Sequence, residues 1–379
     1  MTSIPIGENM IFKYLVISDI HLGHNINKTP YIVNNLKSYF RDYAKELNNL
    51  QAIFLAGDIF DKLLPNSSGD YLLAIEWLTE LILYCKHNKI KLRILEGTPS
   101  HDWNQARLIS SVIAKLNIEV DYKYIDTLHI EYLEYENIYI LYVPDEYKKN
   151  AKDTYEEIKL KLQELNISQV DIAIMHGAFH YQLPMVKLES SHTEEDYLNI
   201  VKYYISIGHI HTPSVFGRIL AQGSFDRLAH NEEEDKGAML ITITDVSDSY
   251  YKFLKNKNAM VFKTIKFKDE PIDKICNTVR SIISKLPMYS NIKIISEVEE
   301  HLSSALKILT KEYPTYNIKI DKIKNKNNTT ELVKQEVLKN SLSITKDNIK
   351  DLLLEEVKKY NLEPNEYSVL LQELDSVLN

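Results

Sequence analysis

Aspartate and histidine side chains that could bind metal ions gather in five short segments of this chain. In order, they are Asp19-Ile20-His21, Gly57-Asp58-Ile59-Phe60-Asp61, Ser100-His101-Asp102, His176-Gly177 and Gly208-His209-Ile210-His211. Carboxylate oxygens and imidazole nitrogens together suit divalent cations such as Mn²⁺. Because a pair of divalent ions a few Å apart is a common device for cleaving phosphate esters, the segments predict a phosphoesterase.

Each of these segments follows a short apolar run that we expect to form a β-strand. The runs cover residues 14–18, 52–56, 92–96, 171–175 and 203–207, and amphipathic helical patterns lie between them. Ligands of open α/β sheets bind beyond the carboxyl ends of the strands, so this repeated order of strand and polar loop indicates one shared site. The region from about residue 12 to residue 221 therefore predicts a layered α/β domain.

The spacing within the segments suggests which side chains could share an ion. Asp19 and His21 would point to the same side of an extended chain, because side chains alternate along a strand. His209 and His211 have the same spacing. Asp58 follows a buried strand and a glycine, where its carboxylate could bridge two cations that lower the pKa of a shared water.

His101 is the best candidate for a general acid. It adjoins Asp102 in a loop after a strand, and a carboxylate beside the ring would raise the pKa of the histidine. A protonated imidazole there could neutralise phosphate charge and protonate the departing alkoxide. His176 would complete the ligands of a second ion, whereas Asp61 is expected to be a turn or helix-start residue.

Beyond residue 237 the sequence predicts further elements and a change of domain. Strands at 238–244 and 260–267 could complete a second sheet, and a small α/β module is expected from about Glu270, with helices at 272–286 and 297–311 and strands at 291–295 and 316–320. A polar linker then precedes two amphipathic helices, near Thr345 and Pro364. The expected domains are 1–269, 270–323 and 324–379, and the last would either clasp a partner helix or dock on its own chain.

Composition excludes several classes of protein. The chain has 379 residues, of which 44% are apolar, and a formal net charge of −8, which argues against a protein that coats nucleic acid without specificity. The sequence has no apolar stretch of about 18 residues and no secretory signal at its start, so we expect a cytoplasmic protein without a membrane segment. Cys85 and Cys276 are expected to be buried thiols. The sequence contains no nucleophile elbow, phosphate-binding loop or dinucleotide glycine motif.

The five segments resemble the hallmark of the calcineurin-like metallophosphoesterases, which is Asp-x-His, Gly-Asp, Gly-Asn-His-Asp/Glu, His and Gly-His-x-His. The resemblance covers residues 12–244 with specific motifs and only architecture beyond. Within this family the chain is similar to the SbcD nucleases. The supporting features are Gly57-Asp58-Ile59-Phe60-Asp61 with nearby Pro65, Gly223-Ser224-Phe225-Asp226-Arg227 followed by an acidic run and Lys236-Gly237, and the small module with terminal helices.

The resemblance implies a fold, a set of ligands and partners. The fold would be a four-layer metallophosphoesterase sandwich, in which two β-sheets are flanked by helices, with a small α/β cap module and C-terminal helices. Asp19, His21, Asp58 and His211 would hold one metal ion, Asp58, His176 and His209 would hold the other, and His101 would be the catalytic histidine. Mn²⁺ would be the usual cofactor, with Mg²⁺ as a substitute. DNA ends, an SbcC-type coiled-coil ATPase bound by the C-terminal helices, and a second copy of the chain in a homodimer would be the partners.

One residue departs from the family pattern, because Ser100 stands where the family has a metal-binding Asn. The shorter hydroxyl could bind the second metal directly, bind it through water, or leave it weakly held. We expect an active enzyme, since the other ligands and His101 remain.

Three functions are compatible with these features. The first is a two-metal-dependent DNA exo/endonuclease, the nuclease subunit of an SbcCD-like complex of DNA repair and recombination. The second is a phosphatase or cyclic-nucleotide phosphodiesterase with the same pair of metals. The third is a non-catalytic scaffold for a partner ATPase, with a site that has decayed at Ser100. Cleavage of DNA, hydrolysis of small phosphoesters and titration with Mn²⁺ would distinguish them.

Overall fold

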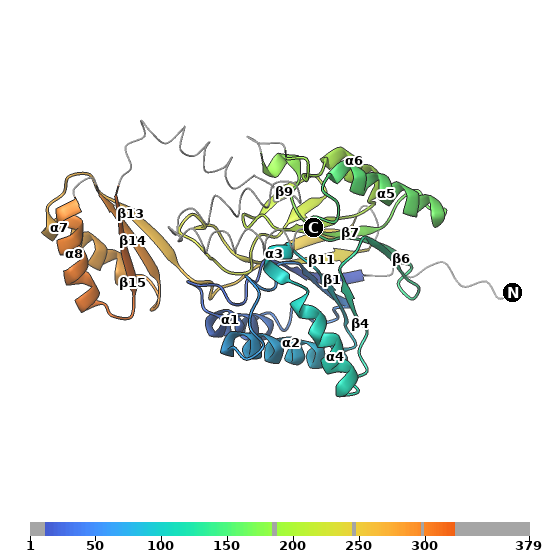
Figure 1. The fold of residues 1–379 in the computed structure, drawn as a ribbon, viewed down its shortest axis with the longest axis horizontal. Coiled ribbons are helices and arrows are strands. Elements are labelled where there is room, and N and C mark those ends of the chain that lie inside the picture. The colour runs from blue at the N-terminus through green and yellow to red at the C-terminus, as the bar shows by residue number, and fades with distance from the viewer. Residues whose placement is uncertain (1–11, 184–187, 245–247, 297–298, 323–379) are drawn as a thin grey trace, which may run out of the picture. The chain divides into compact units, whose positions relative to one another are not determined.

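The computed structural model describes residues 12–183, 188–244, 248–296 and 299–322 (Figure 1). The strands are β1 (Phe12–Ile17), β2 (Ala52–Ala56), β3 (Lys91–Leu95), β4 (Tyr122–Ile125), β5 (His129–Leu133), β6 (Ile138–Val143), β7 (Ile172–His176), β8 (Ile205–Gly208), β9 (Ser214–Phe216), β10 (Ile219–Ala221), β11 (Gly237–Ile243), β12 (Tyr250–Lys255), β13 (Phe262–Lys266), β14 (Asn291–Ser296) and β15 (Asn317–Lys322). The helices are α1 (Thr29–Asp42), α2 (Gly69–Asn88), α3 (Pro99–Asp102), α4 (Leu108–Lys115), α5 (Ala151–Glu164), α6 (Glu194–Ile200), α7 (Ile272–Ile283) and α8 (Glu299–Glu312), with short 3₁₀ turns at Gln105–Arg107 and His180–Gln182.

Two six-stranded sheets carry most of the chain. The first has the order β12-β11-β1-β2-β3-β4, in which β1 to β4 are parallel and β11 and β12 are antiparallel additions at the β1 edge. The second has the order β5-β6-β7-β8-β10-β9, in which β6, β7, β8 and β10 are parallel. The five strands expected to precede the polar segments are confirmed as β1, β2, β3, β7 and β8.

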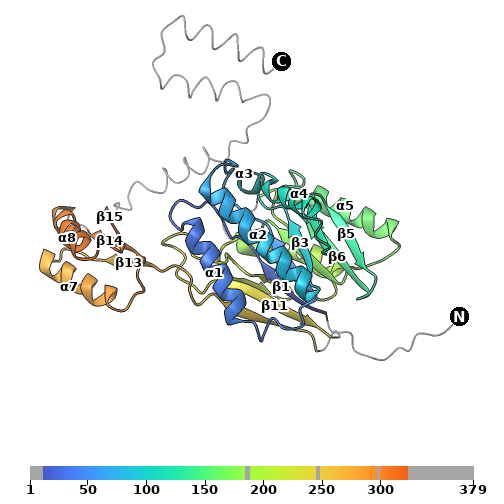
Figure 2. The same ribbon diagram turned by 90° about the horizontal axis from the view of Figure 1, so that it is seen from below.

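The strands alternate their side chains between layers, as the pleat requires. Phe54 of β2 belongs to the apolar cluster between the sheets, together with Ile174 of β7. Leu55, the next residue along β2, belongs to the cluster with Trp77 of α2. Figure 2 shows α1 and α2 lying across the first sheet, and a third cluster joins α5 and α6 to the second sheet. The expected mixed α/β sandwich of two sheets with helices is therefore present.

A third, three-stranded sheet has the order β13-β14-β15 and packs with α7 and α8 around Ile275, Val279 and Ile294. The helices and strands expected between 272 and 320 are confirmed. The prediction that 238–244 and 260–267 complete a second sheet is wrong, because β11 pairs with β1 in the first sheet and β13 pairs in parallel with β14. Ile265 of β13 is buried in the core of this module, so the module begins before Glu270.

The described residues up to Asp321 belong to one compact unit. The two helices expected near Thr345 and Pro364 lie outside the described residues. Both cysteines are buried and free, as expected. In the described ranges, no helix combines the length and the apolar character needed to span a membrane.

Candidate metal centre

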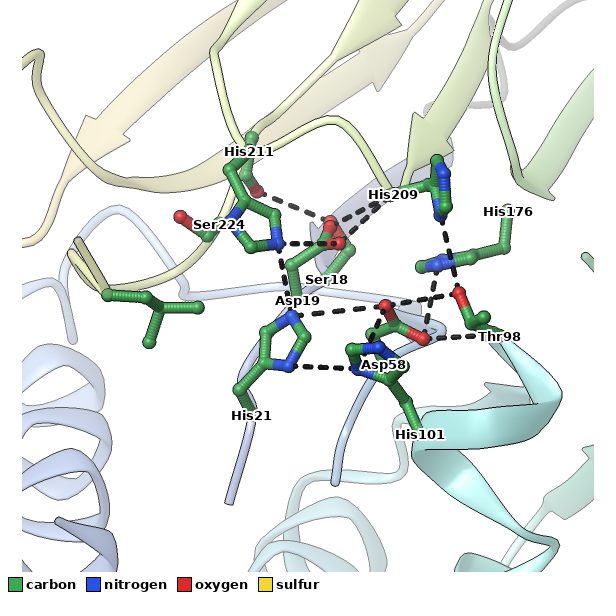
Figure 3. A network of polar contacts seen from close by, with 12 residues as sticks. Ser18, Asp19, His21, Asp58, Thr98, His101, His176, His209, His211 and Ser224 are labelled. Atoms are coloured by element: carbon green, nitrogen blue, oxygen red, sulfur yellow. Dashed lines mark hydrogen bonds and ion pairs between the residues drawn. The ribbon is translucent and has the colours of Figure 1, made fainter. Parts of the chain in front are cut away.

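The carboxyl ends of the central strands of both sheets meet at one cluster of polar side chains (Figure 3). The first sheet brings Asp19 and Asp58 after β1 and β2, and the second brings His176 at the end of β7 and His209 after β8. The backbone N–H of His209 donates to both oxygens of Asp19, at 2.9 and 3.1 Å. This contact joins the two sheets at the site.

A first group of potential ligands consists of Asp19, His21 and His211, whose ligand atoms all lie within 4.8 Å of one another. His21 Nε2 lies 3.1 Å from His211 Nε2, and His211 Nε2 lies 3.8 Å from Asp19 Oδ1. The other ring nitrogen of His21 lies 3.3 Å from Asp61 Oδ1. Asp61, expected only as a turn residue, therefore orients a ligand ring.

Glu232 and Lys236 support the first group, and the sequence prediction missed their role. His211 Nδ1 is 2.8 Å from Glu232 Oε1, and the fully buried Lys236 ammonium lies 3.1 Å from Glu232 Oε2. Burial would raise the pKa of Glu232, but His211 and Lys236 lower it to about 2. The ionised carboxylate holds the His211 proton on Nδ1 and leaves Nε2 for a metal. The acidic run before Lys236-Gly237 was the available sequence signal.

A second group consists of Asp58, His176 and His209, again with ligand atoms within 4.8 Å of one another. His176 Nδ1 is 2.7 Å from the carbonyl oxygen of Ala56, which fixes the ring proton on that nitrogen. His176 Nε2 is buried and lies 3.3 Å from Asp58 Oδ1, but among the described residues it makes no hydrogen bond of good geometry. A cation between these two atoms would satisfy both.

Asp58 links the two groups, because its Oδ2 also lies 3.8 Å from His21 Nε2. The side chain is almost fully buried, and burial alone would raise its pKa. The surrounding imidazoles of His176, His21 and His101 instead hold the pKa of Asp58 well below its usual range. Asp58 is therefore an ionised carboxylate placed to bridge two cations.

The backbone of the ligand loops is left-handed at several residues with a β-carbon. The φ angles are +51° at Asp19, +54° at His21, +51° at Asp58 and +96° at His209. Asp19 and His21 were expected to point to the same side of a strand. They do not lie in a strand, because β1 ends at Ile17. The two side chains converge through a strained loop, as is common at functional sites.

Gly57 and Gly97 allow the loops to approach one another. A Cβ on Gly57 would lie 2.2 Å from His176 Nδ1, and a Cβ on Gly97 would lie 2.1 Å from the backbone nitrogen of Asp58. Gly57 also has a φ of +83°. Any larger residue at either position would displace a ligand.

His101 lies at the edge of this site. Its Nδ1 is 3.3 Å from His21 Nδ1 and 3.8 Å from Asp58 Oδ2, and 35% of its side chain is exposed. With His21 and Asp58 it forms a third set of atoms that could hold an ion. Burial lowers the pKa of His101, although Asp58 opposes this shift. In the protein without substrate, the pKa of His101 is therefore lowered and not raised as predicted.

Asp102 has a different role from the one predicted. Its carboxylate accepts hydrogen bonds from the backbone N–H groups of Asp58 at 3.0 Å, Phe60 at 2.9 Å and Gly97 at 2.8 Å. Burial and the nearby Asp58 raise the pKa of Asp102. Asp102 therefore fixes the positions of two ligand loops instead of raising the pKa of His101.

The suggestion that Ser100 could bind the second ion stays a prediction. Ser100 is exposed on α3, and its carbonyl oxygen accepts a hydrogen bond from the Trp103 indole at 2.9 Å. The hydroxyl beside the second group belongs to Thr98, whose Oγ1 lies 3.3 Å from both Asp58 Oδ2 and His209 Nδ1. The sequence prediction missed Thr98, because it aligned the residue directly before His101 with the family's Asn.

The donor set fits a pair of divalent cations. Asp61 and Glu232 contact the Nδ1 atoms of His21 and His211, which leaves the two Nε2 atoms, 3.1 Å apart, available to cations. This arrangement and the unpartnered His176 Nε2 are both satisfied by cations. Mixed carboxylate and imidazole ligands suit Mn²⁺ and related ions.

Comparisons with known proteins give little beyond these observations. No family model matches the chain, and no curated protein matches it. One similar solved structure, GAP50, the anchor in the inner membrane complex of Plasmodium, has 13% identity and a TM-score of 0.39, over 65% of this chain and 85% of the other. Another, described as an aldo-keto reductase from Pseudomonas aeruginosa, has 8% identity and a TM-score of 0.17, over 82% of this chain and 84% of the other.

Proposed function

We propose that this protein is a two-metal phosphodiesterase that cleaves DNA at its ends, a nuclease of the SbcD type within the calcineurin-like metallophosphoesterases. The observation that carries the proposal is that Asp58 joins two groups of ligands, Asp19, His21 and His211 on one side and His176 and His209 on the other. A single carboxylate shared in this way suits two adjacent ions. The two-sheet sandwich and the position of the site at the strand ends also support it.

Two bound Mn²⁺ ions, or Mg²⁺ in their place, would neutralise phosphate charge and lower the pKa of an attacking water. The residues of the chain would hold and orient the reacting groups. Asp58 would bind between the ions, and Glu232 and Asp61 would keep the His211 and His21 rings in the ligand tautomer. About a third of the side chains of His101, His209 and His211 is exposed, so an extended substrate could reach them.

His101 is proposed to protonate the leaving oxygen. Its pKa is low in the free protein, but an anionic phosphate beside the ring would favour the protonated form. His101 would thus gain its proton when the substrate binds. An SbcC-type ATPase bound through the C-terminal region, and a homodimer, complete the proposal.

The test is an assay on end-labelled duplex DNA with the full chain, with and without Mn²⁺. We expect Mn²⁺-dependent shortening of the labelled strand, abolished by Asp58→Asn. The same preparations are offered a small phosphomonoester and a cyclic nucleotide. Rapid hydrolysis of these small substrates with intact DNA would favour the phosphatase or phosphodiesterase alternative. Fewer than two bound Mn²⁺ ions together with no hydrolysis of any substrate would favour the scaffold.

A further inference from the structure

The Thr98 hydroxyl has more polar neighbours within hydrogen-bonding distance than it has hydrogens to donate. Its Oγ1 lies 3.3 Å from both Asp58 Oδ2 and His209 Nδ1 (Figure 3). It also lies 3.0 Å from Asp145 Oδ2. A hydroxyl has one hydrogen, and ionised carboxylates only accept. One of the two carboxylates therefore faces a lone pair of Thr98.

Asp145 is the better acceptor of that one hydrogen. Its contact is the shorter, and its other oxygen accepts from the backbone N–H of Glu146 at 2.9 Å, which fixes the carboxylate. Asp145 follows β6, the neighbour of β7, so it comes from a strand end like the expected ligands. With the hydrogen directed to Asp145, a lone pair of Thr98 Oγ1 faces Asp58 Oδ2, which also only accepts.

The spacing of these atoms is that of ligands around one ion. Neighbouring ligands of an octahedral ion with bonds of about 2.1 Å lie about 3 Å apart. The separations of 3.3 Å from Thr98 Oγ1 to Asp58 and to His209 are close to this value. The Thr98 backbone N–H also donates to Asp58 Oδ1 at 2.7 Å, which holds the residue in place. Asp145 Oδ2 also lies 3.4 Å from His209 Nδ1, but Asp145 does not belong to the group of mutually close ligand atoms formed by Asp58, His176 and His209.

We propose that Thr98 Oγ1 is a ligand of the second ion and that Asp145 is a positioning residue that accepts the Thr98 hydrogen. The inference rests on the proposed two-metal function, because it completes the same site. Thr98 thereby takes the place of the family's Asn, and Ser100 does not.

The experiment is calorimetric titration of Mn²⁺ into the full-length chain and its variants. Thr98→Val is close in shape and keeps the backbone N–H, but lacks the hydroxyl. We expect wild type to bind two ions and Thr98→Val to bind one as before and the other about a hundredfold more weakly. Asp145→Asn should weaken the same ion about tenfold. Thr98→Ser, which keeps the hydroxyl, should bind two ions.

Ser100→Ala is the matched control, and it should bind two ions like wild type. Two undiminished sites in Thr98→Val, or a weakened site in Ser100→Ala, would overturn the assignment. Melting of each metal-free variant identifies loss of folding, and rescue by Thr98→Ser then decides whether the hydroxyl is the group required. A wild-type chain that binds two ions but leaves DNA intact would contradict the proposed function and leave the Thr98 assignment standing. A Thr98→Val chain with two intact sites beside an active wild type would overturn the Thr98 assignment alone.

Discussion

The two ligand groups use the same types of side chain but are supported differently. In the first, Asp61 and Glu232 carboxylates contact the far nitrogens of His21 and His211. In the second, the far nitrogen of His176 contacts the Ala56 carbonyl. A carboxylate makes an imidazole a more basic ligand than a neutral carbonyl does. The first group should therefore bind its ion more tightly, and the second should depend more on the shared Asp58.

The largest expected effect comes from Asp58→Asn, which removes the charge common to both groups. We expect both Mn²⁺ sites to weaken and DNA cleavage to fall about a thousandfold or more, since several kcal/mol of charge stabilisation depend on the ions. Calorimetry and the end-labelled assay measure the two effects. If one site kept its affinity, Asp58 would belong to a single group and the bridge would be wrong.

His101→Gln should lower the rate of DNA cleavage without weakening the binding of Mn²⁺ to either ligand group. We expect about a 10²- to 10⁴-fold loss of cleavage rate, the usual contribution of a general acid, with two Mn²⁺ ions still bound. Rate measurement and titration are made on the same sample. An unchanged rate would remove His101 from the mechanism, and a lost ion would make it a ligand with His21 and Asp58.

Glu232→Gln should act on the first group alone. Loss of the charge beside His211 is expected to weaken one Mn²⁺ site about 10- to 100-fold, the typical cost of removing a partner of a metal-bound histidine. The second site should keep its affinity. Equal weakening of both sites would mean that the two groups are not supported separately.

Glu131 belongs to neither ligand group, so Glu131→Gln should change neither Mn²⁺ site. Glu131 accepts hydrogen bonds from Arg93 at 2.8 and 2.9 Å and from Tyr142 at 2.8 Å. Burial would raise the pKa of Glu131, but Arg93 lowers it from 4.5 to about 2. A lowered pKa stabilises the fold above about pH 4.5, and this contribution is lost as the pH falls towards 2.

We therefore expect Glu131→Gln to lower the free energy of unfolding by about 2 kcal/mol at neutral pH, with a smaller difference from wild type in acid. Urea unfolding at several pH values measures this change. A difference that stayed constant from pH 7 to pH 2 would show that ionisation of Glu131 is not its origin.

The sequence was sufficient for the five strands that precede the polar segments and for the residues that follow them directly. Asp58, His176 and His209 were predicted because each ends or follows an apolar run, and parallel strands bring such positions to one edge. The position of β13 was not predictable in this way, because an isolated apolar strand gives no sign of its partner. Its pairing depends on Ile265 packing into the core of the module.

The loop before His101 shows why the remaining part of the site was missed. Residues Pro99–Asp102 form a short helix, so Ser100 and Thr98 face different surroundings although they are two positions apart. Sequence order alone favoured Ser100. Asp145 was missed because it lies in a loop after β6 without a neighbouring histidine, and only the fold brings it beside Thr98.

The three amide contacts of Asp102 have a consequence for redesign of this centre. One carboxylate ties the main chain around Asp58 to the turn that begins at Gly97, so the separation between the bridging ligand and His101 is set by peptide groups. Exchanging ligand side chains to change the preferred ion would leave that separation intact. A graft of the two loops onto another scaffold would need to carry Asp102 with them.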